Sequence, residues 1–206
     1  MPIYRNKSKL VLFVHIPKTG GSTIEETLCH CGAMQALKYP SEFEYGLCSP
    51  QHLHSAIYDC IFPKKFWDYG FTVVRNPFTR LISEYMWQFR NFPTVTTNIT
   101  PWVHELLAHA NVDSYLHDNH VRPQYEFTRS VEVFRFEDGL DVAIQRALSA
   151  LGLPMRSGPL RHLKQSRGTK LFVDAQTIER IISFYARDFS LFDYSTTALP
   201  EILSVI

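Results

Sequence analysis

Residues 10 to 28 read LVLFVHIPKTGGSTIEETL. Leu10 to Val14 are strand-forming residues, and they lead through His15-Ile16-Pro17 into a short loop rich in glycine and hydroxyl side chains. A segment of helical type follows, from about Ser22 to Cys31. A strand, a tight loop and a helix in this order commonly hold a phosphate group at the helix N-terminus. The stretch therefore predicts an anion-binding loop.

The loop offers three kinds of group to an anion. Gly20 and Gly21 allow a sharp turn and a close approach of backbone N–H groups to a ligand. Lys18 adds a positive charge, although it precedes the glycines, whereas the familiar nucleotide loop reads G-x-x-x-x-G-K-[ST]. The hydroxyl donors are Thr19, Ser22 and Thr23. A purely structural role is open for Ser22, because Ser22 to Glu25 also fits the capping box S-x-x-E.

The rest of the chain alternates between strand-like and helix-like segments. Strands are expected at Phe71–Arg75 and Val131–Phe136, and Asn76-Pro77 marks the start of a helix. Further helices are expected at about residues 52–58, 101–110, 140–151 and 174–187. This alternation predicts an α/β fold of P-loop-like, three-layer type, with a central parallel β-sheet flanked by helices. With 206 residues and 45% hydrophobic content, residues 1–206 are expected to form a single domain.

Net charge, apolar runs and cysteine spacing limit the classes to which this protein can belong. The formal net charge is +1, so any basic binding site must be local. The apolar run near the start, Leu10–Val14, is too short for a spanning helix or a signal peptide. We therefore expect a soluble, cytoplasmic protein, and a Golgi location only if an anchor was removed from a longer parent. The cysteines form no C-x-x-C pair and are expected to be reduced; a zinc site that combines them with His52 and His54 would lack standard spacing.

A second motif, VVRNPFTRLISEY, spans residues 73–85. Arg75 lies at the carboxyl end of a predicted strand, where ligands of parallel sheets bind. Ser83 follows two helical turns later and can present its hydroxyl toward the same region. Arg80 is expected to pair on the helix surface with Glu84, four residues away. Arg75 has no such local acid, which favours a ligand over a structural ion pair.

Taken together, PKTGGST after one strand and VRNPFTRLISEY after another resemble the sulfotransferases that use 3′-phosphoadenosine 5′-phosphosulfate (PAPS). The likeness is strongest to the carbohydrate branch, which includes heparan sulfate 2-O-sulfotransferase and its microbial relatives. It implies that Lys18 touches the leaving oxygen and the sulfuryl group of the donor. It also implies that Arg75 and Ser83 hold the 3′-phosphate, both in PAPS and in the product 3′,5′-adenosine bisphosphate (PAP). No metal is expected, since cationic side chains can stabilise the developing charge.

The likeness continues along nearly the whole chain. Asn119–Gln124 resembles the R-P-Q segment of the family, and Asp188–Phe192 resembles its ending. His162–Lys170 resembles the loop that closes over the nucleotide, which assigns Arg167, Gly168 and Lys170 to cofactor binding. Independently of the resemblance, the stretch between Pro154 and Val173 holds five Lys or Arg residues and no acid, which is either a solvated face or an anion-binding loop. The chain is short for this family, and this suggests a reduced acceptor region.

Two histidines are candidates for the catalytic base. His52 and His54 in SPQHLHSAIYD resemble the H-x-H histidines of the heparan branch, and an imidazole with a pKa of ~6.5 can accept a proton at neutral pH. His52 is the first choice, His54 the second, and Glu25 the next if neither serves. His15, beside the loop, is expected to shape the end of the strand.

The expected activity is sulfuryl transfer from PAPS to a hydroxyl of an acceptor, with a carbohydrate as the first candidate. A P-loop-type kinase or nucleotide hydrolase is the alternative, which the position of Lys18 and the lack of a magnesium-binding acid pattern disfavour. A non-catalytic nucleotide-binding module is a third possibility. The acceptor is not encoded in a motif. Four aromatic residues could line its cleft or belong to the core, and Trp87 is expected in the core: Trp87, Phe92, Trp102 and Tyr115.

Overall fold

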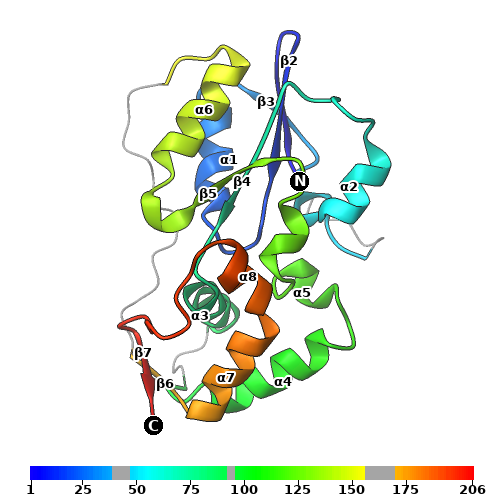
Figure 1. Ribbon diagram of the computed structural model, residues 1–206. Helices are drawn as coiled ribbons and strands as arrows, with labels where there is room; N and C mark the ends of the chain where they lie inside the picture. Colours follow the sequence, from blue (N-terminus) through cyan, green and yellow to red (C-terminus); the bar gives the residue numbers. More distant parts are fainter. Residues whose placement is uncertain (39–46, 92–95, 156–169) are drawn as a thin grey trace. The chain divides into compact units, whose positions relative to one another are not determined.

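The computed structural model describes residues 1–38, 47–91, 96–155 and 170–206 (Figure 1). The chain forms two compact units, and each is described by itself. Unit 1 comprises residues 1–74 and 126–163, and unit 2 comprises residues 75–125 and 164–206. That the two units act as one sulfotransferase domain stays a prediction.

Unit 1 contains a five-stranded sheet with the strand order β3-β1-β2-β4-β5. The strands are β1 Ile3–Asn6, β2 Lys9–Val14, β3 Met34–Ala36, β4 Tyr69–Val74 and β5 Glu132–Arg135. β2, β4 and β5 pair in parallel, whereas β1 pairs antiparallel with both β2 and β3. The predicted α/β class with a central sheet flanked by helices is therefore confirmed, but the sheet is mixed and only β2, β4 and β5 are parallel. The antiparallel strands β1 and β3 were not expected from the sequence.

Helices α1 (Gly21–His30) and α6 (Asp141–Leu151) cover one face of this sheet (Figure 1). Their apolar residues and those of the strands form one core, in which the rings of Phe13 and Phe71 stack at 4.8 Å. Burial of each large apolar side chain there stabilises the fold by about 1.5–3 kcal/mol. Because β2 and α1 both pack into this core, it fixes the position of the loop between them. The shorter helices are η1 Pro50–His52, α2 Ser55–Ile61, η2 Gln124–Phe127 and η3 Phe136–Asp138.

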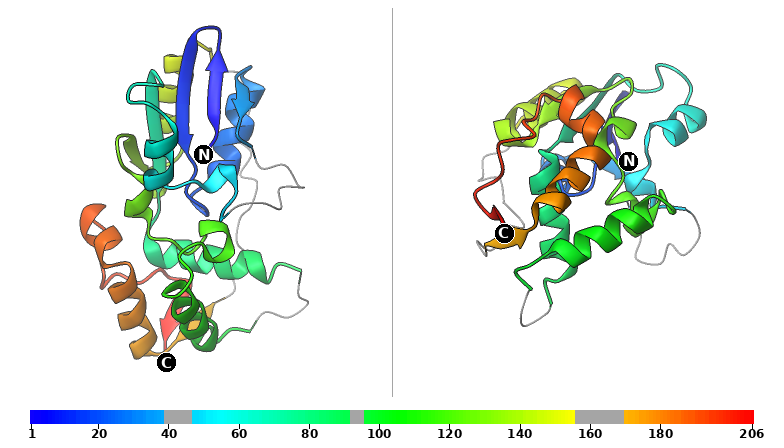
Figure 2. Two further views of the ribbon diagram at one scale, coloured as in Figure 1. Left: turned by 90° about the vertical axis from the view of Figure 1, so that its right-hand side faces the viewer. Right: turned by 60° about the horizontal axis from the view of Figure 1, so that its bottom comes forward.

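Unit 2 is mainly helical. Its helices are α3 Pro77–Gln88, α4 Thr100–Ala110, α5 Leu116–Asn119, α7 Ala175–Phe184 and α8 Ala186–Leu191. A small parallel sheet pairs β6 Leu171–Val173 with β7 Leu203–Val205, and α4 packs against α7 (Figure 2). Asn76 caps α3 as predicted, because its side-chain oxygen accepts hydrogen bonds from the N–H groups of Phe78 and Thr79.

The helix predicted at 174–187 is two helices. Asp174 caps α7 by accepting a hydrogen bond from the N–H of Thr177, but the helix ends at Phe184. The next residue, Tyr185, is buried and donates its hydroxyl proton to the carbonyl oxygen of Val121 at 2.9 Å. Tyr185 lies between α7 and α8, and its hydrogen bond holds the chain at this break. The contact is long-range, so no local sequence pattern predicts it.

The four cysteines are free, as predicted. None of them joins a cluster of metal-ligand side chains within the described residues. In the same residues, no helix is both long enough and apolar enough to span a membrane.

Candidate active site

The loop between β2 and α1 exposes the N-terminus of α1 to a ligand. Gly20 is the N-cap of α1 and adopts a left-handed conformation with φ 87°, which glycine tolerates without strain. The N–H groups of Thr23 and Ile24 donate to the carbonyl of Gly20 at 3.1 and 3.3 Å. The N–H groups of Gly21 and Ser22 precede these first intrahelical bonds, so they point out of the helix end together with the positive end of its dipole. This geometry suits an anion.

The side chains of the loop differ in what they can offer a ligand. Lys18 is half-buried and has φ 70°, a left-handed conformation that costs a non-glycine residue of order 1–3 kcal/mol and that often occurs at functional sites. Thr19 is fully buried and donates its hydroxyl proton to the carbonyl of Ile16 at 2.8 Å, which ties the loop to the end of the strand. Ser22 is exposed, whereas Thr23 is buried.

The capping-box interpretation of Ser22 is wrong. The N-cap is Gly20, with no side-chain cap, and Ser22 lies inside the first turn of α1. Glu25 turns inward instead: its Oε1 atom lies 2.6 Å from Nδ1 of His15 and accepts a hydrogen bond from Nε2 of Gln51 at 2.7 Å. Ser22 is thereby left available for a ligand.

Glu25, His15 and Gln51 form a polar cluster beneath the loop. Burial alone would raise the pKa of Glu25, but its hydrogen bond with His15, the charge of His15 and hydrogen bonds from Gln51 and Gln35 outweigh burial and lower it to about 2. Glu25 is therefore an anion at any physiological pH. A carboxylate this weakly basic is a poor proton acceptor, which speaks against Glu25 as a reserve base.

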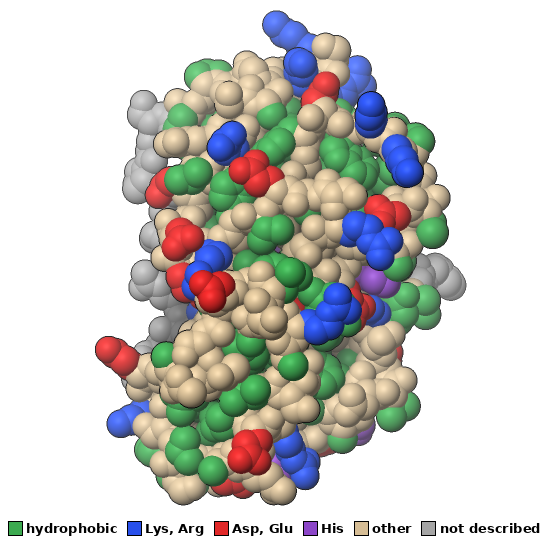
Figure 3. All heavy atoms as spheres, in the orientation of Figure 1, with side chains coloured by type: hydrophobic (Ala, Val, Ile, Leu, Met, Phe, Trp, Pro, Cys, Tyr) green, Lys and Arg blue, Asp and Glu red, His purple; other side chains and the backbone are tan. Residues whose placement is uncertain are grey.

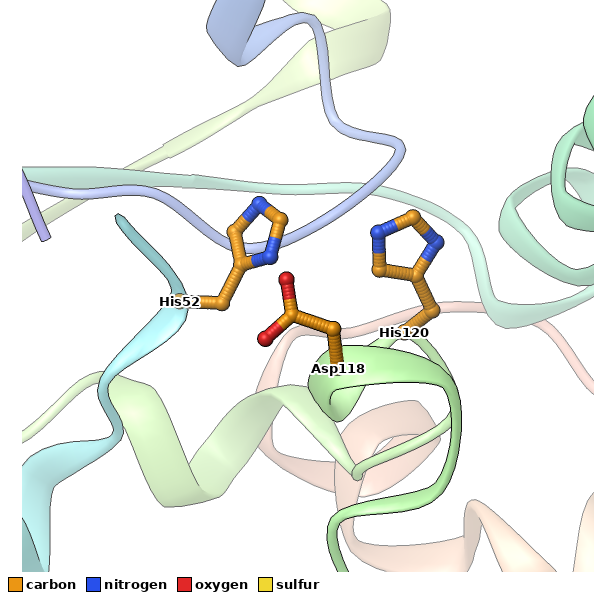
Figure 4. Close-up of side chains that lie close together, drawn as sticks. All are labelled: His52, Asp118 and His120. Atoms are coloured by element: carbon orange, nitrogen blue, oxygen red, sulfur yellow. The ribbon is translucent and has the colours of Figure 1, made fainter. Parts of the chain in front are cut away.

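His15 links the cluster to both the loop and the predicted base. A Cβ atom added to Gly21 would lie 2.2 Å from Nε2 of His15, so the backbone of α1 rests directly on the imidazole. On its other side, the His15 ring meets the ring of His52 edge-on, with centroids 5.0 Å apart. His52 is buried at the end of η1, one residue after Gln51 (Figure 4). The structure thus brings His52 and the start of α1 together through one shared neighbour.

His54 follows His52 by two residues and has a different aromatic neighbour. It is buried and directly precedes α2, and its ring packs edge-on against Phe127 with centroids 6.3 Å apart. The hydroxyl of Ser55, the next residue, donates to the backbone carbonyl of Glu126. Of the two predicted bases, His52 is the one whose ring is seen against His15, which lies beneath the loop.

In unit 2, Arg75 is fixed by its backbone and by its side chain. Its N–H donates to Oε1 of Gln124 at 2.8 Å, and its carbonyl accepts from Nε2 of the same amide at 2.7 Å. Its Nε donates to the hydroxyl of Thr79, at 3.0 Å, so Arg75 has a local partner that is a hydroxyl rather than an acid. Ser83 is half-buried two turns into α3.

A buried carboxylate holds Gln124 in turn. Asp188 accepts hydrogen bonds from the backbone N–H groups of Gln124 and Tyr125 at 2.8 and 2.9 Å. Burial raises the pKa of Asp188, and these backbone hydrogen bonds offset part of that effect. Gln124 of the R-P-Q segment thus holds the backbone of Arg75 from 49 residues away, and Asp188, 113 residues away, holds Gln124. The sequence marked both segments but did not reveal this role.

The surface location predicted for Arg80 and Glu84 is wrong, because both side chains are buried. Arg80 is buried and donates to the carbonyls of Arg122 and His120, both at 2.9 Å. Glu84 is buried as well, and its Oε2 lies 2.7 Å from Nδ1 of His120, while its Oε1 accepts from Gln88. The contacts with His120 and Arg122 span 36 to 42 residues of the chain, so no local sequence pattern indicates them.

Within unit 2, the His120 side chain is held in place by its own set of neighbours. The three residues before it, 117 to 119, all have left-handed φ angles of 49° to 65°, a run that non-glycine residues seldom adopt. An oxygen of Asp118 lies within 4.8 Å of a ring nitrogen of His120, and both side chains project from the α5 segment (Figure 4). A histidine whose Nδ1 is held by a buried carboxylate has a defined tautomer and orientation.

Of the remaining residues predicted for the site, some are described by the structure and others are not. Lys170 is exposed immediately before β6, whereas Arg167, Gly168 and Phe92 lie outside the described residues. Trp87, expected in the core, is only half-buried, and its ring lies 5.1 Å from that of His120. Trp102 and Tyr115 are also half-buried.

The comparison with family models agrees with this geometry. A model described as "Sulfotransferase family" matches residues 2–195. Comparisons with curated proteins and with solved structures gave no significant match. The matched residues include the β2–α1 loop, both H-x-H histidines and the clamp around Arg75. The chain belongs to the sulfotransferase family, whose enzymes transfer a sulfuryl group to an acceptor hydroxyl.

Proposed function

We propose that the protein transfers the sulfuryl group of PAPS to a hydroxyl of a carbohydrate, with a histidine as base. The observation that carries the proposal is the start of α1, where the N–H groups of Gly21 and Ser22 lie at the positive end of the helix dipole and Lys18 belongs to the loop directly before it. That arrangement supports binding of the 5′-phosphosulfate end of the donor. Arg75 and Ser83 are the proposed partners of the 3′-phosphate.

The residues fit the donor chemically. PAPS carries two anionic groups at opposite ends of its ribose, and the sequence resemblance supplies one basic cluster for each. Arg75 is half-buried, its backbone is held by Gln124 and its Nε by Thr79, and a guanidinium is suited to binding a phosphate through two N–H groups. The exposed Lys170 belongs to the segment proposed to cover the nucleotide. Because cations of the protein can neutralise the charge, the proposal requires no metal ion.

The reaction balances as an in-line displacement. The acceptor oxygen forms a bond to sulfur, the bond between sulfur and the bridging oxygen breaks, and PAP leaves with that oxygen. Lys18 stabilises the negative charge that grows on the leaving oxygen, in analogy to phosphoryl transfer. The acceptor's proton passes to His52, whose position beside His15 supports it over His54.

A direct test incubates the protein with PAPS labelled with ³⁵S and separate panels of glycans, phenols and aliphatic alcohols. Labelled glycan together with release of PAP supports the proposal in full. Labelling of phenols alone would keep the sulfotransferase and exclude the carbohydrate acceptor. Turnover of ATP in magnesium, with no use of PAPS, would instead indicate a P-loop-type kinase or hydrolase.

A further inference from the structure

A short segment between α2 and β4 exposes apolar and basic side chains side by side. Residues 61–68 read IFPKKFWD. Ile61 is 56% exposed and Phe66 is 45% exposed, and the two lie within one short segment. Lys64 and Lys65 between them are exposed as well. We call residues 61–68 the IFPKKFWD segment.

The segment is an ordered turn that presents these side chains outward. The ring of Phe62 packs against those of Phe66 and Trp67, with centroids 5.0 and 6.1 Å away. The N–H of Phe66 donates to the carbonyl of Pro63 at 3.2 Å, and Lys65 takes a left-handed φ of 64°. Phe62 and Trp67, both half-buried, therefore anchor the turn, and its two lysines face solvent.

More basic residues adjoin the segment. Its last residue, Asp68, exchanges two hydrogen bonds with the backbone of Leu10 at the start of β2, at 2.7 and 2.8 Å. This contact places the segment beside the β1–β2 hairpin, which exposes three further basic side chains. These are Arg5, Lys7 and Lys9.

The charge of this edge is strongly one-sided. Five basic side chains, at positions 5, 7, 9, 64 and 65, face one acid, Asp68, which leaves a local net charge of +4 in a chain whose total is +1. Figure 3 shows Lys and Arg side chains gathered around the hairpin tip, with hydrophobic side chains between them. The net charge of +1 implies that any basic site of this chain is local. This edge of unit 1 is such a site, in addition to the proposed binding site for PAPS.

We propose that this edge of unit 1 binds the surface of an anionic lipid bilayer. Exposed lysines are attracted to the negative potential of anionic headgroups, and aromatic and aliphatic side chains between them can enter the headgroup boundary. The mixture of both kinds on one edge is the feature that fits a bilayer. The proposal does not depend on the transfer reaction.

The residue types separate a bilayer from other polyanions. Four of the five basic residues are lysines, which act as point charges, whereas recognition of nucleic acid phosphates favours arginine. A soluble polyanion would interact with the lysines but would gain nothing from Ile61 and Phe66. A bilayer, in contrast, offers both an anionic headgroup layer to the lysines and an apolar boundary to Ile61 and Phe66.

The experiment is co-sedimentation of the full chain with vesicles of phosphatidylcholine containing about 30% phosphatidylserine, compared with phosphatidylcholine alone. Since each basic residue near the surface contributes about 1 kcal/mol, or roughly fivefold in binding, the double variant K64E/K65E should bind at least about 25-fold more weakly. Arg180→Glu on α7, an exposed charge reversal elsewhere, should bind like the unaltered protein. Phe66→Ala should weaken the binding that persists in high salt, whereas Leu191→Ala, at another exposed apolar residue, should not.

Three outcomes would overturn the proposal. One is equal binding to both kinds of vesicle. Another is a K64E/K65E variant that binds as well as Arg180→Glu. The third is binding to heparin or nucleic acid that depends on Lys64 and Lys65 while the anionic vesicles stay unbound. Activity with PAPS is measured separately, so a failure of the proposed function leaves the vesicle result intact.

Discussion

The Nδ1 atom of His15 lies 2.6 Å from the Oε1 atom of Glu25, and both side chains are almost fully buried. His15 directly follows β2, Glu25 lies in the helix after the loop, and Gln51, which bonds to both, directly precedes His52. One buried carboxylate thus joins three pieces of chain that meet at the proposed site. Because an ionised group in the interior is costly unless it is paired, this cluster should be rigid and sensitive to substitution.

Glu25 should make the fold sensitive to acid. Its pKa falls from 4.5 to about 2 on folding, so its contribution to stability is complete above pH 4.5 and is lost as the pH falls toward 2. The shift corresponds to about 3 kcal/mol, since one pKa unit equals 1.36 kcal/mol. Glu25→Gln should remove this part of the pH dependence, and the measurement is urea unfolding at several pH values between 2 and 7. A variant with the same pH profile as the unaltered protein would contradict the pairing.

Gly21 should tolerate no side chain while His15 is present. A Cβ atom there would lie 2.2 Å from Nε2 of the imidazole, so Gly21→Ala must displace either the ring or the start of α1. Overpacking of this kind typically costs 1–3 kcal/mol, and we expect weaker PAP binding as well. Thermal unfolding and calorimetry would measure the two effects. The double variant G21A/H15A should be less destabilised than the sum of the single changes, because removal of the ring removes the clash.

The sequence predicted the parts of the structure that depend on neighbouring residues. The strand–loop–helix at residues 9–30, the parallel strands β4 and β5 and the Asn76 cap all follow from local patterns, and the structure contains them. The strands β1 and β3 are only four and three residues long, and the hairpin turn at Lys7 lacks the usual glycine or asparagine. Their pairing is decided by the sheet and not by their own sequence.

The polar contacts of the site were predictable only in part. Residue types and motif order marked Lys18, Arg75 and His52, but not the groups that hold them. Gln124 meets Arg75 across 49 residues, and Glu84 meets His120 across 36. A buried polar group must find a partner somewhere, and a local pattern does not say where. That is why the sequence predicts a capping box for Glu25 and a surface position for Glu84, whereas both side chains are buried.

Arg75 should govern affinity for the 3′-phosphate. Arg75→Ala should weaken PAP binding by about 1.5–3 kcal/mol, the range for hydrogen bonds to charged groups, while ADP binding should change less. Gln124→Ala should cause a smaller loss, because it releases the backbone of Arg75 but keeps its charge. Calorimetry with both nucleotides makes the comparison, and Arg90→Ala, at an exposed arginine beyond α3, is the control. Unchanged PAP affinity in a folded Arg75→Ala variant would make this arginine structural.

Lys18 should act on turnover more than on affinity. The charge on the leaving oxygen grows during the transfer, so a cation beside it stabilises the transition state more than the bound donor. Lys18→Ala should therefore lower kcat by a larger factor than it raises KM for PAPS. Steady-state kinetics with PAPS varied at saturating acceptor would show the split. A normal kcat with a raised KM would mean that Lys18 contributes uniform binding only.

His52 should carry the base function. His52→Ala should lose on the order of 10²–10⁴ in turnover and still bind PAP, because general base catalysis is typically worth that much. His54→Ala should lose less, since its ring packs against Phe127, whereas the ring of His52 meets that of His15. Activity of the unaltered protein should fall on the acid side, where a protonated imidazole no longer accepts a proton, and this acid limb should flatten in the His52 variant. His109→Ala, at an exposed histidine on α4, serves as the control.

The comparison is made at saturating PAPS, with PAP affinity measured for every variant so that misfolding is not mistaken for lost chemistry. If both the His52 and the His54 variants keep near-normal turnover and the acid limb, neither is the base. Glu25 would then be a poor substitute, because its pKa of about 2 leaves it little affinity for a proton. The next candidate is His120, whose Nδ1 is held 2.7 Å from the buried carboxylate of Glu84 and whose Nε2 is thereby the basic nitrogen. In that case His120→Gln, and not His52→Ala, should abolish the acid limb.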